Sequence, residues 1–382
     1  MRSVSDYRCF GWLSVALVVG YFLVGWWPFA FRPLNQVRWL PDRAGLDFAD
    51  DGIAHDFEAL PDSGKPRVAG QPANYTVELW VEAGVKPATD VFHLLTLHDG
   101  QLPSPFVLCQ WRQAIILRAA TRDPRSARRI HEVGVDGALE ERRVRLITVT
   151  GSGAGTDFYL DGMRVGHFPE FVLDPEVLAG RMILGNSPAG KHSWVGRFFG
   201  LALYSRALEA TEIAQHHAAW TRGLAPQFVN DPGLRALYVF DEGRGQRAED
   251  RSRNRHWLTI PAIYRPFDNE FLVPPWRDMA YEGPDYRDIA VNIMGFVPFG
   301  VCLFLHRRRT ASAPRFADAL FVVVAGGVIS LTIETIQVWL PTRASSLTDL
   351  LANTVGTLLG VLLALALRLK FTSAECGSPS PS

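Results

Sequence analysis

Six polar residues near the carboxyl end of the sequence have types and spacings that could do chemistry. They form three pairs: Asp288 and Asn292, Glu334 and Gln337, Asp349 and Asn353. Spacings of three and four residues put both members of a pair on one face of a helix. A carboxylate so placed can transfer protons, and carboxamides beside it can hold a polar group by hydrogen bonds. Arg343, between the second and third pairs, adds a cation that could anchor an anionic head group.

Each pair lies at one end of a long run with almost no charged residue. The runs are Cys9–Phe31, Ile289–Leu305, Ala319–Leu340, which Glu334 interrupts, and Leu350–Leu367. About 20 apolar residues in a helix cross a bilayer core roughly 30 Å thick. The sequence therefore predicts four transmembrane helices. A cleaved signal peptide is the alternative for the first run, but bulky Trp26 and Trp27 stand where a cleavage site needs small residues.

The distribution of basic residues predicts the orientation of these helices. Arg307, Arg308, Arg309 and Arg315 lie between the second and third runs, and Arg368 and Lys370 follow the fourth, whereas only Arg343 lies between the third and fourth. Because basic loops stay in the cytoplasm, both termini should be cytoplasmic. The stretch from about 32 to 285 should then lie outside, and the six polar residues should converge on the outer half of the bundle.

Glu334 is the most informative of the six residues. It lies about seven residues from the loop, which is roughly 10 Å below the interface at helical rise. A charge at that depth costs about 3 kcal/mol, so Glu334 should be neutral or partnered by Arg343, Gln337 or Asn353. Two interpretations stay open: a functional cavity, or interhelical hydrogen bonds that only hold the helices together.

The middle of the chain reads as an all-β domain. Tyr75–Ala83, Val144–Thr150 and Phe158–Gly166 alternate apolar and polar residues, and Asp161-Gly162 is a strong hairpin signal. Gly151–Gly155 is expected to link two strands, since no helix follows it to bind phosphate. One helix is predicted at Arg206–Trp220. There His216 and His217 are adjacent and thus on different faces, which does not suit one metal ion.

Successive segments of this region resemble concanavalin A-like, laminin-G-type jelly rolls. They are YTVELWV, FYLDGMRVG, ILGNSPAG and WVGRFFGLALYSRALEATEIAQHH, and the resemblance covers Leu46–Ala262. It implies binding of carbohydrate or protein, in some relatives with calcium, for which Asp157 and Asp161 are weak candidate ligands. No carboxylate stands out as catalytic, since Glu78 and Glu82 are explained by a solvated strand face. Leu237–Pro261 resembles a strand and turn that such domains usually carry at their start.

The last hundred residues resemble the VanZ-like membrane proteins. The matching motifs are DIAVNIMGFVPFG (Asp288–Gly300) and IETIQVWLPTRASSLTDLLANTVGTLLG (Ile333–Gly360). They contain all six polar residues, Arg343 and a Pro-Phe-Gly sequence at Pro298. The chain departs from the compact four-span form by inserting the β domain after the first span. The resemblance implies a bacterial envelope protein, and the namesake of the family is associated with lowered susceptibility to the glycopeptide teicoplanin.

The predicted fold is therefore a multi-domain membrane protein with an all-α four-helix bundle and an all-β jelly-roll sandwich. Its order is a cytoplasmic N-terminus (1–8), a first span (9–31), a linker (32–45), the jelly roll (46–262), a second linker (263–287), three spans (288–367) and a disordered cytoplasmic tail (368–382). Pro298, within the second span, lacks an N–H and should free one backbone carbonyl.

Two functional hypotheses follow for a protein of the bacterial cytoplasmic membrane. In the first, it binds an envelope glycan or a lipid-linked precursor without catalysis, in contact with the bilayer and with other membrane proteins. In the second, it is an intramembrane enzyme in which Glu334 and Asp349 are the acid–base pair. A transporter is a weaker third reading, because no internal repeat is visible.

Composition excludes two further classes of protein. The 39 basic and 39 acidic residues balance, which excludes a general nucleic-acid binder. Four cysteines, Cys9, Cys109, Cys302 and Cys376, are too scattered for a zinc site or a disulfide scaffold. No cofactor is expected beyond calcium in the β domain.

Overall fold

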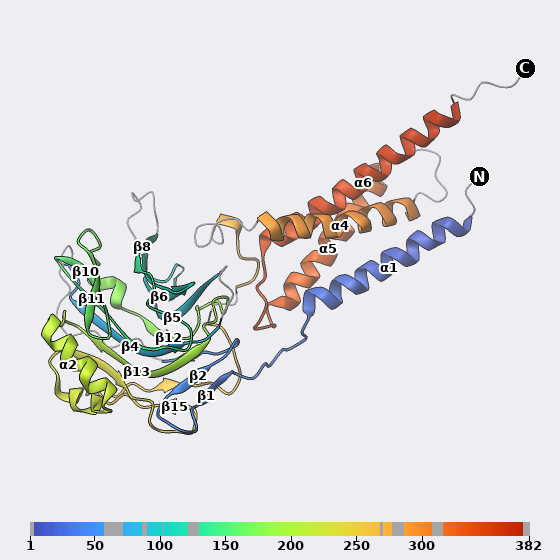
Figure 1. Ribbon diagram of the computed structural model, residues 1–382. Helices are drawn as coiled ribbons and strands as arrows, with labels where there is room; N and C mark the ends of the chain where they lie inside the picture. Colours follow the sequence, from blue (N-terminus) through green and yellow to red (C-terminus); the bar gives the residue numbers. More distant parts are fainter. Residues whose placement is uncertain are drawn as a thin grey trace, which may run out of the picture. The chain divides into compact units, whose positions relative to one another are not determined.

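The chain forms two compact units, which we describe separately. One unit comprises residues 1–31 and 269–382, and the other is Arg32–Asp268. The computed structural model (Figure 1) describes residues 4–56, 72–85, 90–101, 103–120, 130–267, 270–276, 286–307 and 316–376. Three arginines that support the predicted orientation of the helices, Arg308, Arg309 and Arg315, lie outside these ranges.

The first unit contains four long apolar helices: α1 (Val4–Trp26), α4 (Tyr286–Arg307), α5 (Phe316–Gln337) and α6 (Leu347–Cys376). Each of them is long and apolar enough to cross a membrane over Cys9–Trp26, Tyr286–Arg307, Phe316–Gln337 and Leu347–Leu367. Many of their large apolar side chains are exposed, as lipid-facing residues are. Helix α6 continues to Cys376, so the expected disordered tail begins as helix, because Leu, Arg, Lys and Ala favour that conformation.

Close backbone packing joins α4 to α6. A Cβ atom added to Gly356 would lie 2.1 Å from the Ile293 carbonyl oxygen, and one added to Gly360 would lie 2.2 Å from that of Val297. Because Ile293 and Val297 are four apart, as the two glycines are, the helices run parallel in this register. Asp288 and Asn292 of α4 therefore lie at the level of the first two turns of α6.

Helix α1 packs on α4 through aromatic side chains. Tyr21 stacks on Phe296 with 4.4 Å between ring centroids, and its hydroxyl donates to the Gly295 carbonyl at 2.7 Å. Gly295 directly follows Met294, whose carbonyl loses its helical donor because residue 298 is proline. The Met294 carbonyl is therefore the one that Pro298 leaves without a donor. The next carbonyl, that of Gly295, accepts the hydrogen bond from the Tyr21 hydroxyl.

The second unit is a sandwich of two antiparallel sheets. The first sheet has the order β1–β2–β13–β4–β9–β10–β11, with β14 beside β13, and the second has the order β15–β16–β3–β12–β5–β6–β7–β8. The strands of the first sheet are β1 (Val37–Trp39), β2 (Leu46–Phe48), β4 (Tyr75–Ala83), β9 (Val144–Ser152), β10 (Gly155–Leu160), β11 (Met163–Phe168), β13 (Gly196–Tyr204) and β14 (Leu234–Tyr238). Those of the second are β3 (Ala54–His55), β5 (Val91–His98), β6 (Phe106–Trp111), β7 (Ala114–Ala120), β8 (Ile130–Val135), β12 (Arg181–Leu184), β15 (Arg247–Ala248) and β16 (Leu258–Thr259).

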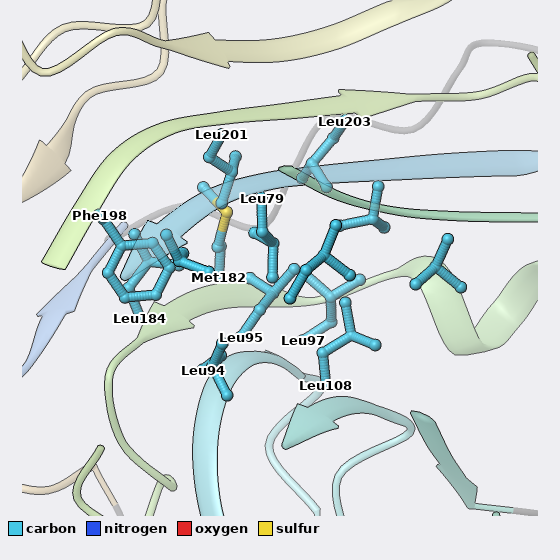
Figure 2. Packing of buried hydrophobic residues seen from close by; sticks show 14 of the residues in the cluster. Leu79, Leu94, Leu95, Leu97, Leu108, Met182, Leu184, Phe198, Leu201 and Leu203 are labelled. Atoms are coloured by element: carbon cyan, nitrogen blue, oxygen red, sulfur yellow. The ribbon is translucent and has the colours of Figure 1, made fainter. Parts of the chain in front are cut away.

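The core lies between the inner faces of the two sheets. Figure 2 shows leucines of β4 and β13 meeting leucines of β5, β6 and β12, with Met182 and Phe198 among them. Alternation with period two supplies these inward side chains. Between the strands, the described residues form three short helices: η1 (Pro175–Leu178), α2 (Ala210–Thr221) and η2 (Ala225–Asn230).

The sequence predicted several of these elements in detail. Tyr75–Ala83 is β4, and the hairpin around Asp161-Gly162 joins β10 to β11. The glycine-rich Gly151–Gly155 joins β9 to β10, as expected.

Three stretches differ from the expectation. Residues 32–45, expected as a linker, contain β1, which pairs with β2. The expected second linker (263–287) pairs at its start, since Ile263 bridges to Leu34. The late stretch Leu237–Pro261 supplies β15, β16 and the end of β14 to the same sandwich, because strand pairing depends on register and not on order in the chain.

Candidate functional site

Glu334 lies on α5 with 2% of its surface exposed. Its Oε2 atom accepts a hydrogen bond from the backbone N–H of Ser346 at 2.7 Å, and the Ser345 side chain also bonds to it. Ser346 directly precedes α6, whose first N–H groups have no partner within the helix and carry the positive end of its dipole. The carboxylate of Glu334 therefore caps α6.

A short segment fixes the position of this cap. Val273 pairs with Ser346, the Val273 N–H donates to the Ser345 carbonyl at 3.0 Å, and the Leu347 N–H donates to the Val273 carbonyl at 3.0 Å. The Leu272 N–H donates to the Ser345 hydroxyl at 3.1 Å. These bonds hold the turn that presents the Ser346 N–H to Glu334.

Gln337 and Arg343 bind the end of α1. Gln337 Nε2 donates to the Gly25 carbonyl at 2.9 Å, and Arg343 Nε donates to the Trp27 carbonyl at 2.9 Å, with Nη2 3.4 Å from the Val24 carbonyl oxygen. The last carbonyls of a helix lack intrahelical donors and carry partial negative charge, so a cation there is favourable. Arg343 forms no ion pair with any described residue, so it partners a helix end and not Glu334.

Asn353 joins α6 to α5. Its Nδ2 atom donates to the Ser330 hydroxyl at 2.9 Å, and both residues are buried. Asp349 lies in the first turn of α6, where its N–H is 3.4 Å from the Ser346 hydroxyl. Asp349 and Asp288 both interact electrostatically with Glu334, so the structure brings carboxylates of three helices together. Asn292 is half-buried on α4, one turn below Asp288.

We call the six residues Asp288, Asn292, Glu334, Gln337, Asp349 and Asn353 the polar cluster. Two of its buried atoms, Gln337 Oε1 and Asn353 Oδ1, have no hydrogen-bond partner among the described residues. Sequence reasoning missed Ser330 and Ser346. Ser330 is four residues from Glu334, and Ser346 followed three residues later by Asp349 matches a capping signature, so both signals were available.

In the β unit, the weak calcium candidates have other partners. Asp157 Oδ1 lies 2.9 Å from His167 Nδ1, while Asp161 accepts from Arg145 and from the Leu146 N–H. The described residues contain no group of three or more His, Cys, Asp or Glu side chains that could hold a metal ion. Asp157 and Asp161 thus have protein partners, and calcium binding by the domain stays a prediction.

Glu78 is not on a solvated strand face, and that expectation was wrong. It is completely buried, and its two oxygens contact His216 Nδ1 and Trp220 Nε1, each at 3.0 Å. His216 Nε2 lies 3.3 Å from an oxygen of Asp231. Helix α2 covers the outer face of β4 at this point. The alternation of apolar and polar residues in β4 does not by itself show that another element packs on that face. The predicted separation of His216 from His217 holds, since only His216 is buried.

Burial would by itself lower the pKa of His216, but its hydrogen bond to the Glu78 carboxylate and the charges of Glu78 and Asp231 raise this pKa above its usual value. Glu82, by contrast, keeps contact with solvent and pairs with Arg43 and Arg197.

A pocket of about 300 Å³ opens at one end of the second sheet. Asp99 after β5, His131 in β8, and Glu170 and Asp174 before η1 supply its polar lining. The segment that carries Glu170 and Asp174 is fixed by the buried side chains of Phe171 and Leu173. Carboxylates on a rigid rim can accept hydrogen bonds from hydroxyl groups, as sugar-binding pockets require.

Comparison with known proteins finds a matching family for each of two parts of the chain. Residues 240–368 match the VanZ/LLP1 family, and residues 56–214 match the concanavalin A-like lectin/glucanases superfamily. Protein VanZ of Enterococcus faecium is 35% identical over 79 residues. That match covers 21% of this chain and 45% of the VanZ protein, so the chain spans less than half of that relative.

Two solved structures illustrate the likeness of the β unit. A putative carbohydrate-binding protein from Bacteroides ovatus superposes with a TM-score of 0.40 at 15% identity, over 58% of each chain. The CBM40 module of Ruminococcus gnavus IT-sialidase, bound to α2,3-sialyllactose, superposes with a TM-score of 0.35 at 11% identity, over 45% of this chain and 96% of that one.

The family matches, the strand pairing and the four apolar helices agree with one another. The chain is therefore a membrane protein that carries a VanZ-like domain and, between its first two apolar helices, a concanavalin A-like lectin domain.

Proposed function

We propose that this protein binds an envelope glycan through its jelly roll and tethers it to the outer face of a bacterial cytoplasmic membrane, without catalysing a reaction. The observation that carries this proposal is the place of the lectin-class unit, which is inserted between two helices able to span a membrane. A polymer bound by such a unit is held close to the bilayer. The helices would anchor the unit and contact a lipid-linked head group.

The charge distribution supports this orientation. Four arginines lie in and beside the connection between α4 and α5, whereas the connection between α5 and α6 has Arg343 as its single basic residue. With four spans and basic loops inside, both termini are cytoplasmic and the jelly roll is extracytoplasmic.

The environment of Glu334 favours binding over catalysis. A general acid or base must reach a proton on its substrate. Here Glu334 is buried and its carboxylate is already bonded to the start of α6, while Arg343 is bonded to the end of α1. Both residues therefore act on neighbouring helices.

The polar pocket at the end of the second sheet is our candidate glycan site. Its volume of about 300 Å³ is at the lower end of the range of small-molecule pockets, which suits one sugar residue. Acidic side chains on its rim would accept hydrogen bonds from the hydroxyl groups of a sugar.

The test measures binding of purified envelope polysaccharide to the full-length protein in mild detergent. The Glu170→Gln/Asp174→Asn double variant should weaken binding about tenfold or more, the loss expected when two hydrogen bonds weaken. Asp42→Asn changes an exposed carboxylate elsewhere on the β unit and should have no effect. Undiminished binding by the double variant, or no binding by the wild type, would refute the proposal.

A second candidate function is catalysis on a lipid-linked envelope precursor, with Glu334 and Asp349 as the acid–base pair. The proximity of Asp349 and Asp288 to Glu334 favours it, because like charges shift proton affinity where a reaction needs it. If it is correct, Glu334→Gln should abolish turnover of the precursor and any teicoplanin tolerance, with glycan binding unchanged. If the binding function is correct, deletion of the jelly roll should remove that tolerance and Glu334→Gln should not.

A further inference from the structure

An apolar groove of about 790 Å³ lies among the helices α1, α4 and α5. Its two walls are faces of α1 and α5, which contribute Val15, Val18, Val19, Phe321, Ala325 and Ile329. Phe299 and Leu303 of α4 also line it, and Phe299 is buried, so α4 forms the floor. Val15, Val19 and Phe321 are exposed, so the groove is open at its side. We call it the α1–α5 groove.

Contacts between the helices set the limits of this groove. At Gly11 of α1, an added Cβ atom would lie 2.6 Å from the His306 ring of α4, so these two helices touch there as they do at the aromatic contact described above. At Gly25, an added Cβ atom would lie 2.7 Å from the Ile333 side chain of α5. The α1–α5 groove therefore ends before Gly25, and α1 stays in contact with α4 on both sides of it.

The lining of the groove suits hydrocarbon. Most of its residues are apolar. Ser14 is an exception, but its hydroxyl already donates to the Phe10 carbonyl at 2.8 Å, so it is satisfied within α1. Inside a bilayer there is no water to fill an apolar groove that is open at the side, so an acyl chain is the ligand that its surface favours.

The depth of the groove matches one leaflet of a bilayer. Its lining runs from Gly11 to Val19 on α1 and from Phe321 to Ile329 on α5, which is about 12 Å along each helix at helical rise. Half of a bilayer core is about 15 Å thick. A membrane-spanning helix of a second copy needs about 30 Å, and the contact at Gly25 stops the groove short of that length. An acyl chain of one leaflet therefore fits better than a helix.

A cation stands beside one wall of the groove. The guanidinium of Arg307 lies 4.0 Å from the centroid of the Phe321 ring. Its Nε and Nη2 atoms donate to Asp318 Oδ1 at 3.3 and 3.2 Å, whereas Nη1 makes no hydrogen bond with any described residue. A guanidinium has the geometry to donate to a carboxylate and to a phosphate at the same time.

The sequence around this end of the bundle is basic. Residues 1–12 and 306–320 contain six arginines and two aspartates, which leaves four positive charges in excess. In the orientation proposed above, this is the cytoplasmic end. Basic residues beside a groove between helices on that side are typical of sites that bind the head groups of anionic phospholipids.

We propose that the α1–α5 groove binds an anionic glycerophospholipid, with one acyl chain in the groove and the phosphate beside Arg307. The lipid would then join α1 to α5 over the stretch where the two helices do not touch. This goes beyond the proposed function and needs no glycan binding by the jelly roll. Only the assignment to the cytoplasmic leaflet rests on the proposed orientation.

The first experiment compares two lipids that differ in head-group charge. The full-length protein is reconstituted in nanodiscs with equal fractions of phosphatidylglycerol and phosphatidylcholine that have the same acyl chains. Lipids that stay bound after release into mild detergent are counted by native mass spectrometry. Phosphatidylglycerol should be retained about fivefold more than phosphatidylcholine, the ratio expected for one favourable contact between a cation and an anionic head group.

Two variants of the same size test the groove itself. Ala325→Phe places a ring inside the groove and should remove most of the retained phosphatidylglycerol. Val324→Phe places a similar ring on an exposed position of the same helix, outside the groove, and should leave retention unchanged.

A double variant tests the head-group contact at constant net charge. Arg307→Gln/Asp318→Asn removes both members of the ion pair and should bring the two lipids to equal retention. Arg287→Gln removes a cation at the opposite end of α4 and should leave the preference for phosphatidylglycerol intact.

Photolabelling of the wild type locates the chain without any variant. Phosphatidylglycerol with a diazirine in one acyl chain is retained as above and irradiated in detergent, and the labelled peptides are identified by mass spectrometry. Label should concentrate in residues 11–19 and 321–329. Leu358 and Leu362, which are exposed on α6 and do not line the groove, should receive little.

Equal retention of both lipids by the wild type would overturn the inference, and so would label spread evenly over all four helices. Retention that survives Ala325→Phe, or a preference that survives Arg307→Gln/Asp318→Asn, would overturn it as well. A dimer that carries no lipid and is lost in Ala325→Phe would make a second copy the occupant. Glycan binding is measured on the same preparations, since its absence refutes the proposed function and leaves the lipid site standing.

Discussion

At the scale of single residues, the buried carboxylate of Glu78 joins β4 to helix α2. Glu78→Ala would leave the His216 ring and the Trp220 N–H without their buried acceptor, because both bond to the same carboxylate. Removing one member of such a buried pair costs about 3 kcal/mol. We expect a clear drop in the urea midpoint of the jelly roll, measured by pulse proteolysis of the full-length protein. Asp42→Ala, on an exposed side chain, should leave the midpoint within error.

The raised pKa of His216 makes its contribution depend on pH. A histidine whose pKa is higher in the folded than in the unfolded state stabilises the fold fully below about pH 6.5, and this stabilisation is lost as the pH rises through the folded-state pKa. The stability difference between wild type and His216→Gln should therefore shrink between pH 6 and about pH 8. A difference that grows with pH would show that the His216 pKa is lowered.

His93 provides the opposite case in the second sheet. Burial first, then the nearby charges of His192 and Arg118, hold the pKa of His93 well below its usual value. The unfolded chain then binds a proton that the folded chain does not, so His93 costs stability as the pH falls below about 6.5. We expect His93→Gln to narrow the stability loss of the protein between pH 6.5 and pH 5. A pH profile that is unchanged by the substitution would contradict this.

At the scale of helices and strands, the contact of α4 with α6 depends on hydrogen in place of Cβ at three positions, Gly300, Gly356 and Gly360. Gly360→Ala would put a methyl group 2.2 Å from a backbone oxygen, which only separation of the helices can relieve. We expect a loss of about 1–3 kcal/mol, measured as a lower melting temperature in detergent. Gly295→Ala, where a Cβ meets nothing within 4 Å, should leave that temperature unchanged or raise it slightly.

The sequence was sufficient to predict helices that contain a long apolar run and strands that alternate apolar and polar residues. It was not sufficient to predict which other elements pack against them. The apolar runs gave all four long helices, and the alternation in Tyr75–Ala83 gave β4. Neither pattern reports what covers the outer face of a strand, which is why Glu78 was misplaced. Helix period predicts which polar residues share a helix face, but the bonding of Arg343 to the end of α1 depends on a tertiary contact with a residue 316 positions away in the chain.

At the scale of the whole molecule, membrane sidedness is open to a direct test. Single cysteines are introduced at Glu249, which is exposed on the β unit, and at Lys370, after replacement of the native cysteines. In cells with a permeabilised outer layer, a membrane-impermeant maleimide should label Glu249→Cys at once. Lys370→Cys should react only after the cytoplasmic membrane is disrupted. The reverse pattern would place the jelly roll in the cytoplasm.

The pairing of Leu34 with Ile263 has a consequence for how such a chain could arise. The Asn35 N–H donates to the Ala262 carbonyl at 3.1 Å and the Tyr264 N–H donates to the Pro33 carbonyl at 2.9 Å, so the chain enters and leaves the β unit through two hydrogen-bonded segments about 5 Å apart. A coding cassette inserted in frame after the first helix could therefore add the whole sandwich in one genetic event. The host gene would need no other rearrangement, and excising the same cassette should return a short four-helix protein.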